Sequence, residues 1–103
     1  MLSTVTLTSL AVTRQTLTFA TSKDMVVEAI ELQDADNPAL ALIVVCPKGS
    51  QSLGALLAGG PTSTPGGQVY WSGRLVLRAD EEIRGYVDAS TVADRLFLTV
   101  KAR

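Results

Sequence analysis

The sequence predicts an all-β domain, a two-layer antiparallel β-sandwich of the jelly-roll or immunoglobulin-like kind with seven or eight strands. Two observations lead to this prediction. Short segments in which apolar and polar residues alternate recur along the chain, and clusters of turn-forming residues separate them. Threonine, serine, valine and leucine are abundant, whereas charged residues make up only 18% of the chain, unlike the composition of helical proteins. A length of 103 residues predicts a single domain over residues 1–103.

Four strands are predicted in the N-terminal half, over residues 3–10, 15–20, 25–32 and 39–46. The third alternates imperfectly, because Glu28 shares a face with Val26 and Ile30. The fourth is apolar on both faces. Because a sandwich strand normally turns one face to water, something is expected to cover the outer side of the fourth strand. The cover is either the loop that follows or a neighbouring subunit.

Residues 47–67 are predicted to form one long flexible loop rich in glycine, serine, threonine and proline. Its apolar island, Leu53–Leu57, is interpreted as a turn of helix. A loop of this length is unusual in a compact domain and is often functional. Leu53, Leu56 and Leu57 would gain no stabilisation from burial if they stayed in solvent, so the loop is expected to make contacts outside its own core. The alternative is that the island folds back over its own sheet.

The C-terminal third is predicted to hold strands over 68–71, 73–78, 82–89 and 95–101, with a bend or bulge at Ser72–Gly73. The period of two points one set of apolar residues inward: Leu75, Leu77, Ile83, Val87, Leu96, Leu98 and Val100. The opposite set contains Arg74, Val76, Arg78, Arg84, Tyr86, Phe97, Thr99 and Lys101. Aromatic and arginine side chains together are typical of interface centres, and an ordinary solvated sheet face is the alternative. The predicted interface residues are therefore Arg74, Val76, Arg78, Arg84, Tyr86 and Phe97, together with Leu53, Leu56 and Leu57 of the loop.

The residue types that most enzymes use are missing. The chain contains no histidine, which removes the commonest general base and the commonest metal ligand. Its one cysteine, Cys46, follows the apolar run Ile43–Val45 and is predicted to be a buried, unreactive thiol. The acidic clusters Asp34/Asp36 and Asp80–Glu82 lie in predicted turns and are interpreted as solvated carboxylates rather than a metal site. No catalytic residue, cofactor or metal is expected.

The charge balance and the short apolar runs argue against two classes of partner, nucleic acids and membranes. Nine basic and ten acidic residues nearly cancel, so no nucleic-acid partner is expected. The N-terminus carries no leader pattern, and the longest apolar run is too short to cross a bilayer, so no membrane partner is expected. A single cysteine cannot form an intramolecular disulfide, which is consistent with folding in a reducing cytoplasm.

One stretch, Trp71–Val87, resembles small virion structural proteins of tailed phages. In their pattern a strand ending L-x-L is followed by x-A-G-D-x-[IL], a further strand and a closing strand. Leu75, Leu77, Ala79 and Ile83 stand at the corresponding places, while Asp80 and Glu81 replace the usual glycine and aspartate. The resemblance covers about 30 residues of the chain. It implies a non-catalytic component of a virion, folded in the host cytoplasm.

Within that class we expect a capsid decoration protein, with a head–tail joining or tail accessory ring protein as the alternative. The expected partners are phage capsid or head–tail proteins and further copies of the chain. The resemblance favours a homotrimer. The N-terminal strand, free to add to a neighbour's sheet, also fits an oligomer. A carbohydrate-binding or adhesion module is the alternative of another class, and its platform would draw on Trp71, Tyr70, Tyr86 and Phe97.

Overall fold

A computed structural model describes residues 1–51, 54–89 and 91–103. The described residues form eight antiparallel strands in two four-stranded sheets, which confirms the predicted sandwich. Sheet A contains, in spatial order, β1 (Leu2–Thr8), β8 (Arg95–Ala102), β3 (Met25–Asp34) and β6 (Gln68–Leu77). Sheet B contains β2 (Arg14–Ala20), β7 (Glu81–Asp88), β4 (Leu40–Pro47) and β5 (Ala55–Pro61).

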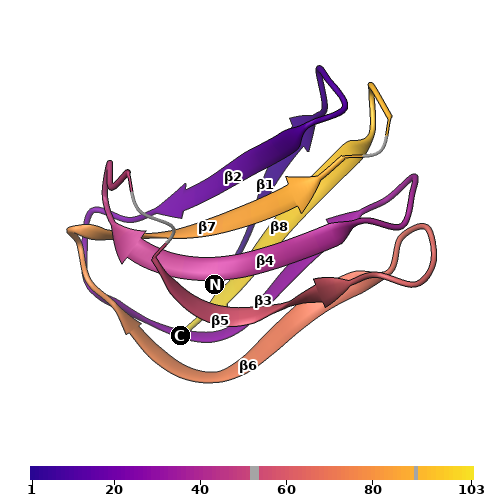
Figure 1. Cartoon of the computed structure of the whole chain (residues 1–103). Helices are drawn as coiled ribbons and strands as arrows, with labels where there is room; N and C mark the ends of the chain where they lie inside the picture. Colours follow the sequence, from indigo (N-terminus) through magenta and orange to yellow (C-terminus); the bar gives the residue numbers. More distant parts are fainter. Residues whose placement is uncertain (52–53, 90) are drawn as a thin grey trace.

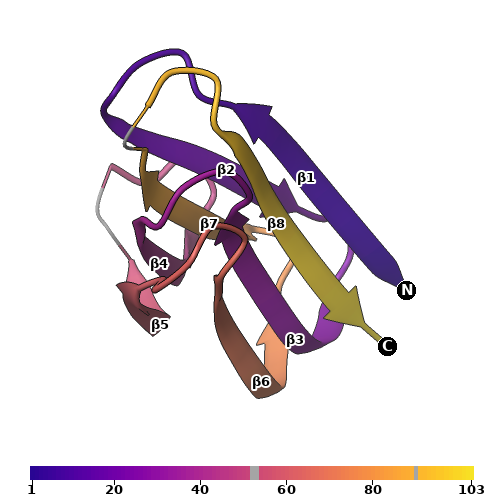
Figure 2. The ribbon, with the colours of Figure 1, turned by 90° about the vertical axis from the view of Figure 1, so that its right-hand side faces the viewer.

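The strand order decides between the two predicted kinds of sandwich. The orders β1-β8-β3-β6 and β2-β7-β4-β5 are those of an eight-stranded jelly roll. Among the described strands, β4 and β5 are the one consecutive pair that lies in the same sheet, and every other connection crosses to the opposite layer. Figure 1 shows the two layers, and Figure 2 shows β8 between β1 and β3.

Side-chain alternation builds the core, as predicted. Leu77, Ile83, Val87, Leu96, Leu98 and Val100 are buried between the sheets, together with Leu17, Val27, Ile30, Leu32 and Ile43. Leu75 is half-buried against this cluster. At about 25 cal/mol per Å² of apolar surface, burial of such residues is the main force that closes the sandwich.

A register shift in the pairing of β3 explains why the alternation of apolar and polar residues in this strand is imperfect. The register shifts between Val27 and Ala29 against both neighbours of β3. This shift lets Val27 and Ile30 both point into the core, while Glu28 between them stays half-exposed and pairs with Arg103. On β6 the same irregularity falls beside Gly73, so the predicted bend at Ser72–Gly73 is confirmed within one continuous strand.

The prediction of one continuous loop over 47–67 is wrong, because residues 55–61 form β5 and pair with β4. The predicted helical turn at Leu53–Leu57 is wrong for its described part, where residues 55–57 are extended; Leu53 lies outside the described residues. The sequence pattern did not predict this strand, because Gly59, Gly60 and Pro61 are residues typical of loops. An edge strand tolerates such residues because one side of its backbone needs no partner.

The chain itself covers the outer side of β4. Val44 is fully buried and Cys46 is 2% exposed, although both lie on the outer face of sheet B. Gly54 packs closely on this surface: a Cβ atom added there would lie 2.8 Å from the Cβ of Cys46. Of the two covers expected from the sequence, the segment after β4 therefore supplies at least part.

The molecule has two distinct ends. The first and last strands pair along their length, and the N-terminal amine donates a hydrogen bond to the carbonyl of Ala102. Figure 2 shows both termini at one end, opposite the loops that join β1 to β2 and β7 to β8. Within the described residues there is no helix long and apolar enough to cross a membrane.

Candidate functional site

The structure divides the predicted interface residues between opposite faces. Arg74 and Val76 of β6 are exposed on the outer face of sheet A, Arg78 directly after β6 is also exposed, and Phe97 of β8 is half-buried on that face. Arg84 and Tyr86 of β7 lie on the outer face of sheet B. The residues therefore form no single patch. The alternation correctly gave the outward direction of each side chain, but it carried no information on which sheet each strand joins.

Arg84 is committed to a contact inside the chain. Its Nε lies 3.1 Å from Oε2 of Glu82, and the two side chains are only 12% and 8% exposed. Its Nη1 donates to the carbonyl of Ser50, and Oε1 of Glu82 accepts from the Gly49 N–H. The hydrogen bond and charge of Arg84 lower the pKa of Glu82, so the pair is ionised and largely satisfied.

The described leucines of the predicted loop point in opposite directions. Leu57 packs against the core, whereas Leu56 is 62% exposed on the outer face of sheet B. The alternative interpretation, in which the island folds back over its own sheet, therefore holds for Leu57. Leu56 stays available to a partner, and Leu53 lies outside the described residues.

A second exposed apolar surface, which sequence reasoning missed, lies at the end opposite the termini. The loops after β1 and β7 run side by side there (Figures 1 and 2), and Ser9 exchanges backbone hydrogen bonds with Ala93 and Asp94. They carry Leu10, Val12 and Val92, which are 83%, 61% and 60% exposed. We call these three side chains the apolar tip. Of these residues, only Val92 lay in a predicted turn; Leu10 was placed at the end of the predicted strand over residues 3–10, which the structure ends at Thr8.

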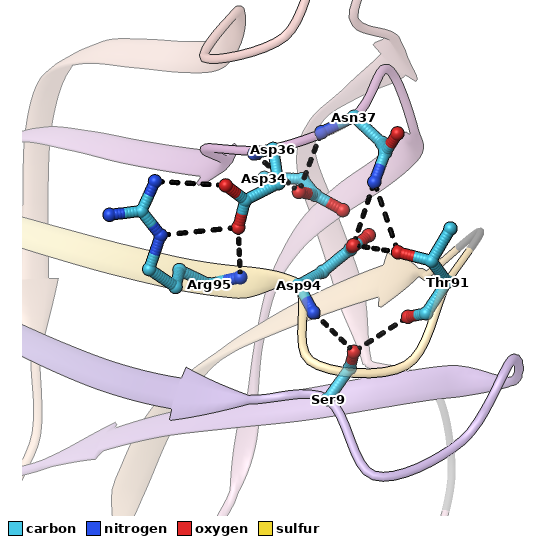
Figure 3. A network of polar contacts seen from close by, with 7 residues as sticks. All are labelled: Ser9, Asp34, Asp36, Asn37, Thr91, Asp94 and Arg95. Atoms are coloured by element: carbon cyan, nitrogen blue, oxygen red, sulfur yellow. Dashed lines mark hydrogen bonds and ion pairs between the residues drawn. The ribbon is translucent and has the colours of Figure 1, made fainter.

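A partly buried cluster of three acidic residues lies beside the turn before β8, shown in Figure 3. It consists of Asp34 at the end of β3, Asp36 two residues later, and Asp94 immediately before β8. One carboxylate oxygen from each lies within 4.8 Å of the others. Asp34 and Asp94 are both only 1% exposed, because β3 and β8 are antiparallel neighbours and the end of one meets the beginning of the other.

Hydrogen bonds hold one oxygen of each buried carboxylate. Oδ1 of Asp34 accepts from the backbone N–H groups of Asp36 and Asn37, at 3.0 and 3.1 Å. Oδ1 of Asp94 accepts from Nδ2 of Asn37 at 2.7 Å and from the hydroxyl of Thr91. The second oxygens, Oδ2 of Asp34 and Oδ2 of Asp94, are buried without a hydrogen-bond partner.

The third carboxylate, that of Asp36, is paired with Arg95. Oδ1 of Asp36 lies 2.8 Å from Nη2 of Arg95, and Oδ2 accepts from the Arg95 backbone N–H at 2.8 Å. Burial, with the nearby Asp94 carboxylate, raises the pKa of Asp34 to about 6. Burial acts to raise the pKa of Asp94, but its contacts with Asp34, Thr91 and Asn37 together outweigh burial and hold this pKa below its ordinary value. Full burial closes Asp34 and Asp94 to a solvent-borne substrate, so the cluster is not arranged for acid–base catalysis.

The sequence interpretation of Asp34 and Asp36 as solvated turn residues is wrong for Asp34, which is buried. The cluster depends on Asp94, which sequence reasoning did not single out. Its connection to Asp34 follows only from the pairing of β3 with β8, and no local pattern reports that pairing.

A shallow groove of about 240 Å³ crosses the outer face of sheet A. Leu2, Ala29, Glu31, Tyr70, Thr99 and Lys101 line it. Tyr70 is 50% exposed and is the aromatic residue of this lining. Of the aromatic residues proposed from sequence for a platform, Tyr70 and Phe97 lie on the outer face of sheet A. Tyr86 lies on the opposite sheet, and Trp71 packs against the core.

Comparisons with known proteins give the fold and no family. No family model matches the chain, and no curated protein matches it. Among solved structures, the pre-peptidase C-terminal domain of a collagenase from Bacillus anthracis is similar with a TM-score of 0.52 and 9% identity, covering 96% of this chain and 88% of that one. A mannanase with a CBM35 module from Podospora anserina has a TM-score of 0.49 at 11% identity, and the chain spans 26% of its length. A structure of infectious bursal disease virus has a TM-score of 0.29 at 11% identity, and the chain spans 31% of its length.

Proposed function

We propose that this chain is a structural assembly module of a tailed-phage particle, most specifically a capsid decoration protein that docks through its apolar tip. The observation that carries the proposal is the exposure of Leu10, Val12 and Val92 on two adjacent loops of one end. Aliphatic side chains exposed together at 60% or more are a feature of docking surfaces rather than of solvated turns. The phage class comes from the resemblance of Trp71–Val87.

The fold supports such a role. A jelly roll is a rigid two-sheet scaffold that viruses use widely in capsids, and its loops gather at the ends of the sandwich. The tip loops rest on backbone hydrogen bonds between Ser9 and residues 93 and 94, so the apolar tip is preorganised. A preorganised surface loses little conformational entropy on docking.

The edge of sheet A suits self-association. β1 and β6 are the outer strands of this sheet, and Arg74 and Val76 of β6, with Arg78 directly after it, are exposed to solvent. An unpaired strand edge is a ready surface for a second copy of the chain. The proposal therefore includes a homotrimer formed away from the apolar tip, which leaves the tip free for the capsid.

Co-sedimentation tests the docking. The full chain is mixed with capsids of the phage whose genome encodes it, and Leu10→Asp and Val92→Asp are compared with Leu56→Asp, a leucine on sheet B that is exposed to the same degree as Val92. We expect the two tip variants to lose at least about tenfold in affinity, because a buried charge replaces an apolar contact. Leu56→Asp should bind like the wild type. Loss of binding in Leu56→Asp with full binding by the tip variants would move the docking site to β5, and no binding by the wild type would reject the proposal.

Light scattering tests the oligomer separately. We expect a mass of three chains at micromolar concentration, unchanged by the tip variants. A monomer at that concentration would contradict the trimer while leaving the docking result to stand on its own.

The groove on sheet A favours a second candidate, a carbohydrate-binding module. Tyr70 offers a half-exposed ring, and Glu31, Thr99 and Lys101 offer polar groups around it. A sugar can stack on such a ring and hydrogen-bond to its surroundings. Calorimetric titration with soluble polysaccharides tests this candidate. Binding that Tyr70→Ala abolishes, together with no binding to capsids, would favour it over the assembly module.

A further inference from the structure

We propose that Asp34, Asp36 and Asp94 form a binding site for one Ca²⁺ ion that ties together the loop end of the jelly roll. The three carboxylates come from two segments that are distant in sequence; those of Asp34 and Asp94 face each other, and that of Asp36 faces Arg95 beside them (Figure 3). The inference does not depend on the docking proposal, because it concerns the cluster itself.

The buried oxygens without partners point to a ligand. Oδ2 of Asp34 and Oδ2 of Asp94 lack a hydrogen bond, and both side chains are 99% removed from solvent. A buried carboxylate oxygen normally has a partner, since an unpaired one loses its hydration without gaining a hydrogen bond. Two such oxygens on neighbouring like charges require either a proton or a cation between the carboxylates.

The geometry suits calcium. Oxygens on opposite sides of one Ca²⁺ ion, each at about 2.4 Å, are about 4.8 Å apart. One oxygen from each of the three carboxylates lies within 4.8 Å of the others, so a single ion can contact all three. Three carboxylates in one site exceed the one or two that Mg²⁺ usually takes from a protein, and an all-oxygen set disfavours Zn²⁺ and Cu²⁺. Water completes the coordination shell.

The charge balance supports a divalent ion. The three carboxylates and the paired Arg95 together carry two net negative charges when ionised, which one Ca²⁺ neutralises. Asp36 can contribute while it remains bound to Arg95, because each carboxylate oxygen has two lone pairs. Its side chain is 33% exposed, which gives an ion a path from solvent.

The ion would connect two segments of the chain. Asp34 and Asp36 belong to the end of β3 and the loop after it, and Asp94 belongs to the turn before β8. The hydroxyl of Ser9 accepts from the Asp94 N–H at 2.9 Å and donates to the Thr91 carbonyl at 2.8 Å. Binding at the cluster would therefore also steady the loop that carries Leu10.

Calorimetric titration of the full chain with CaCl₂, after treatment with EDTA, tests the site. We expect one ion per chain and a rise in melting temperature with Ca²⁺, since a ligand that binds only the folded state stabilises it. Asp34→Asn and Asp94→Asn should each lose at least about tenfold in affinity. Asp80→Asn removes the same charge from the exposed turn between β6 and β7 and is the matched control, with affinity unchanged.

Folding of the variants is checked independently. In EDTA, Asp34→Asn and Asp94→Asn should melt at or above the wild-type temperature, because the new amide can donate to the neighbouring carboxylate oxygen. If one variant fails to fold, the other carries the test. Absence of saturable binding by the wild type up to about 10 mM Ca²⁺, weaker than known protein calcium sites, would overturn the proposal. Equal loss of binding in Asp80→Asn, or a wild-type melting temperature that Ca²⁺ leaves unchanged, would also overturn it.

Discussion

Two buried ionic groups in this domain have opposite character. On the outer face of sheet B, Glu82 and Arg84 form a pair of opposite charges, with hydrogen bonds from the Gly49 N–H and to the Ser50 carbonyl. At the loop end, Asp34 and Asp94 bring like charges together, and each has an oxygen without a partner. The first group is complete within the chain, whereas the second is not. The difference teaches that unsatisfied buried charge, rather than buried charge itself, is the signal of a missing ligand.

The largest effect is expected from breaking the complete group. Glu82→Gln would leave the Arg84 guanidinium buried without its counter-charge and should lower the free energy of unfolding by about 3 kcal/mol. Urea denaturation at neutral pH measures the loss. Glu28→Gln is the matched control, because its partner Arg103 is 65% exposed and an exposed pair contributes little. Equal losses of unfolding free energy in Glu82→Gln and Glu28→Gln would mean that burial does not make the first ion pair more stabilising than the second.

The second test uses pH, because the two groups should respond with opposite sign. The folded pKa of Asp34, about 6, is higher than the value of about 3.9 for an unfolded aspartate, so the folded state binds this proton more tightly. The contribution of Asp34 to stability is therefore full below about pH 4 and is lost as pH rises through about 6, and roughly 2 kcal/mol of it is lost between about pH 4.5 and 7. Glu82, whose pKa is lowered, contributes stability above its unfolded pKa and loses it as pH falls through the folded value.

Chemical denaturation in EDTA between about pH 4.5 and 7 measures this difference for the wild type and Asp34→Asn. We expect the stability of the wild type to fall relative to that of the variant across this window. Asp36, Asp94 and Arg95 are the other charged groups at the cluster, and all three remain in the variant. If the stabilities of the wild type and of Asp34→Asn change with pH in parallel, the carboxylates of Asp34 and Asp94 do not share a proton.

Cys46 reports on the packing beside the complete group. It is 2% exposed, and burial raises the pKa of its thiol. We expect a thiol reagent to label Cys46 in the native wild type only through rare opening, at least about a hundredfold slower than in denaturant. Glu82→Gln should speed the labelling, because it lowers the stability of the same region. Rapid labelling of the native wild type would mean that the segment after β4 does not seal this face.

The smallest effect on stability is expected from a change at Asp36, the most exposed carboxylate of the acidic cluster. Asp36→Asn removes an ion pair in which Arg95 is 63% exposed, and we expect no measurable change in urea stability. The same variant should weaken Ca²⁺ binding, because it removes a proposed ligand. A variant that loses stability but keeps its calcium affinity would assign Asp36 to the fold alone.

The sequence predicted much of the fold because alternation is local. Leu96, Leu98 and Val100 follow the period of two without interruption, so the last strand and its inward face were predictable. β5 was missed because Gly59–Pro61 has the composition of a loop. The candidate sites were less accessible to prediction. The Asp34–Asp94 contact and the separation of Arg84 from Arg74 both depend on which strands become neighbours, and that information is not local.

The strand order also has a consequence for biosynthesis. β8 lies between β1 and β3, and in the described structure it is the hydrogen-bonded neighbour of β1. Sheet A therefore cannot close until residues 95–102 have left the ribosome, and β1 must wait without its strand partner while the roughly 90 residues between the two strands are synthesised. Such distant pairings carry a high entropic cost of loop closure and slow folding to about the millisecond-to-second range. The threonines that alternate along β1 keep one of its faces polar during that interval, which limits its tendency to associate with other nascent chains.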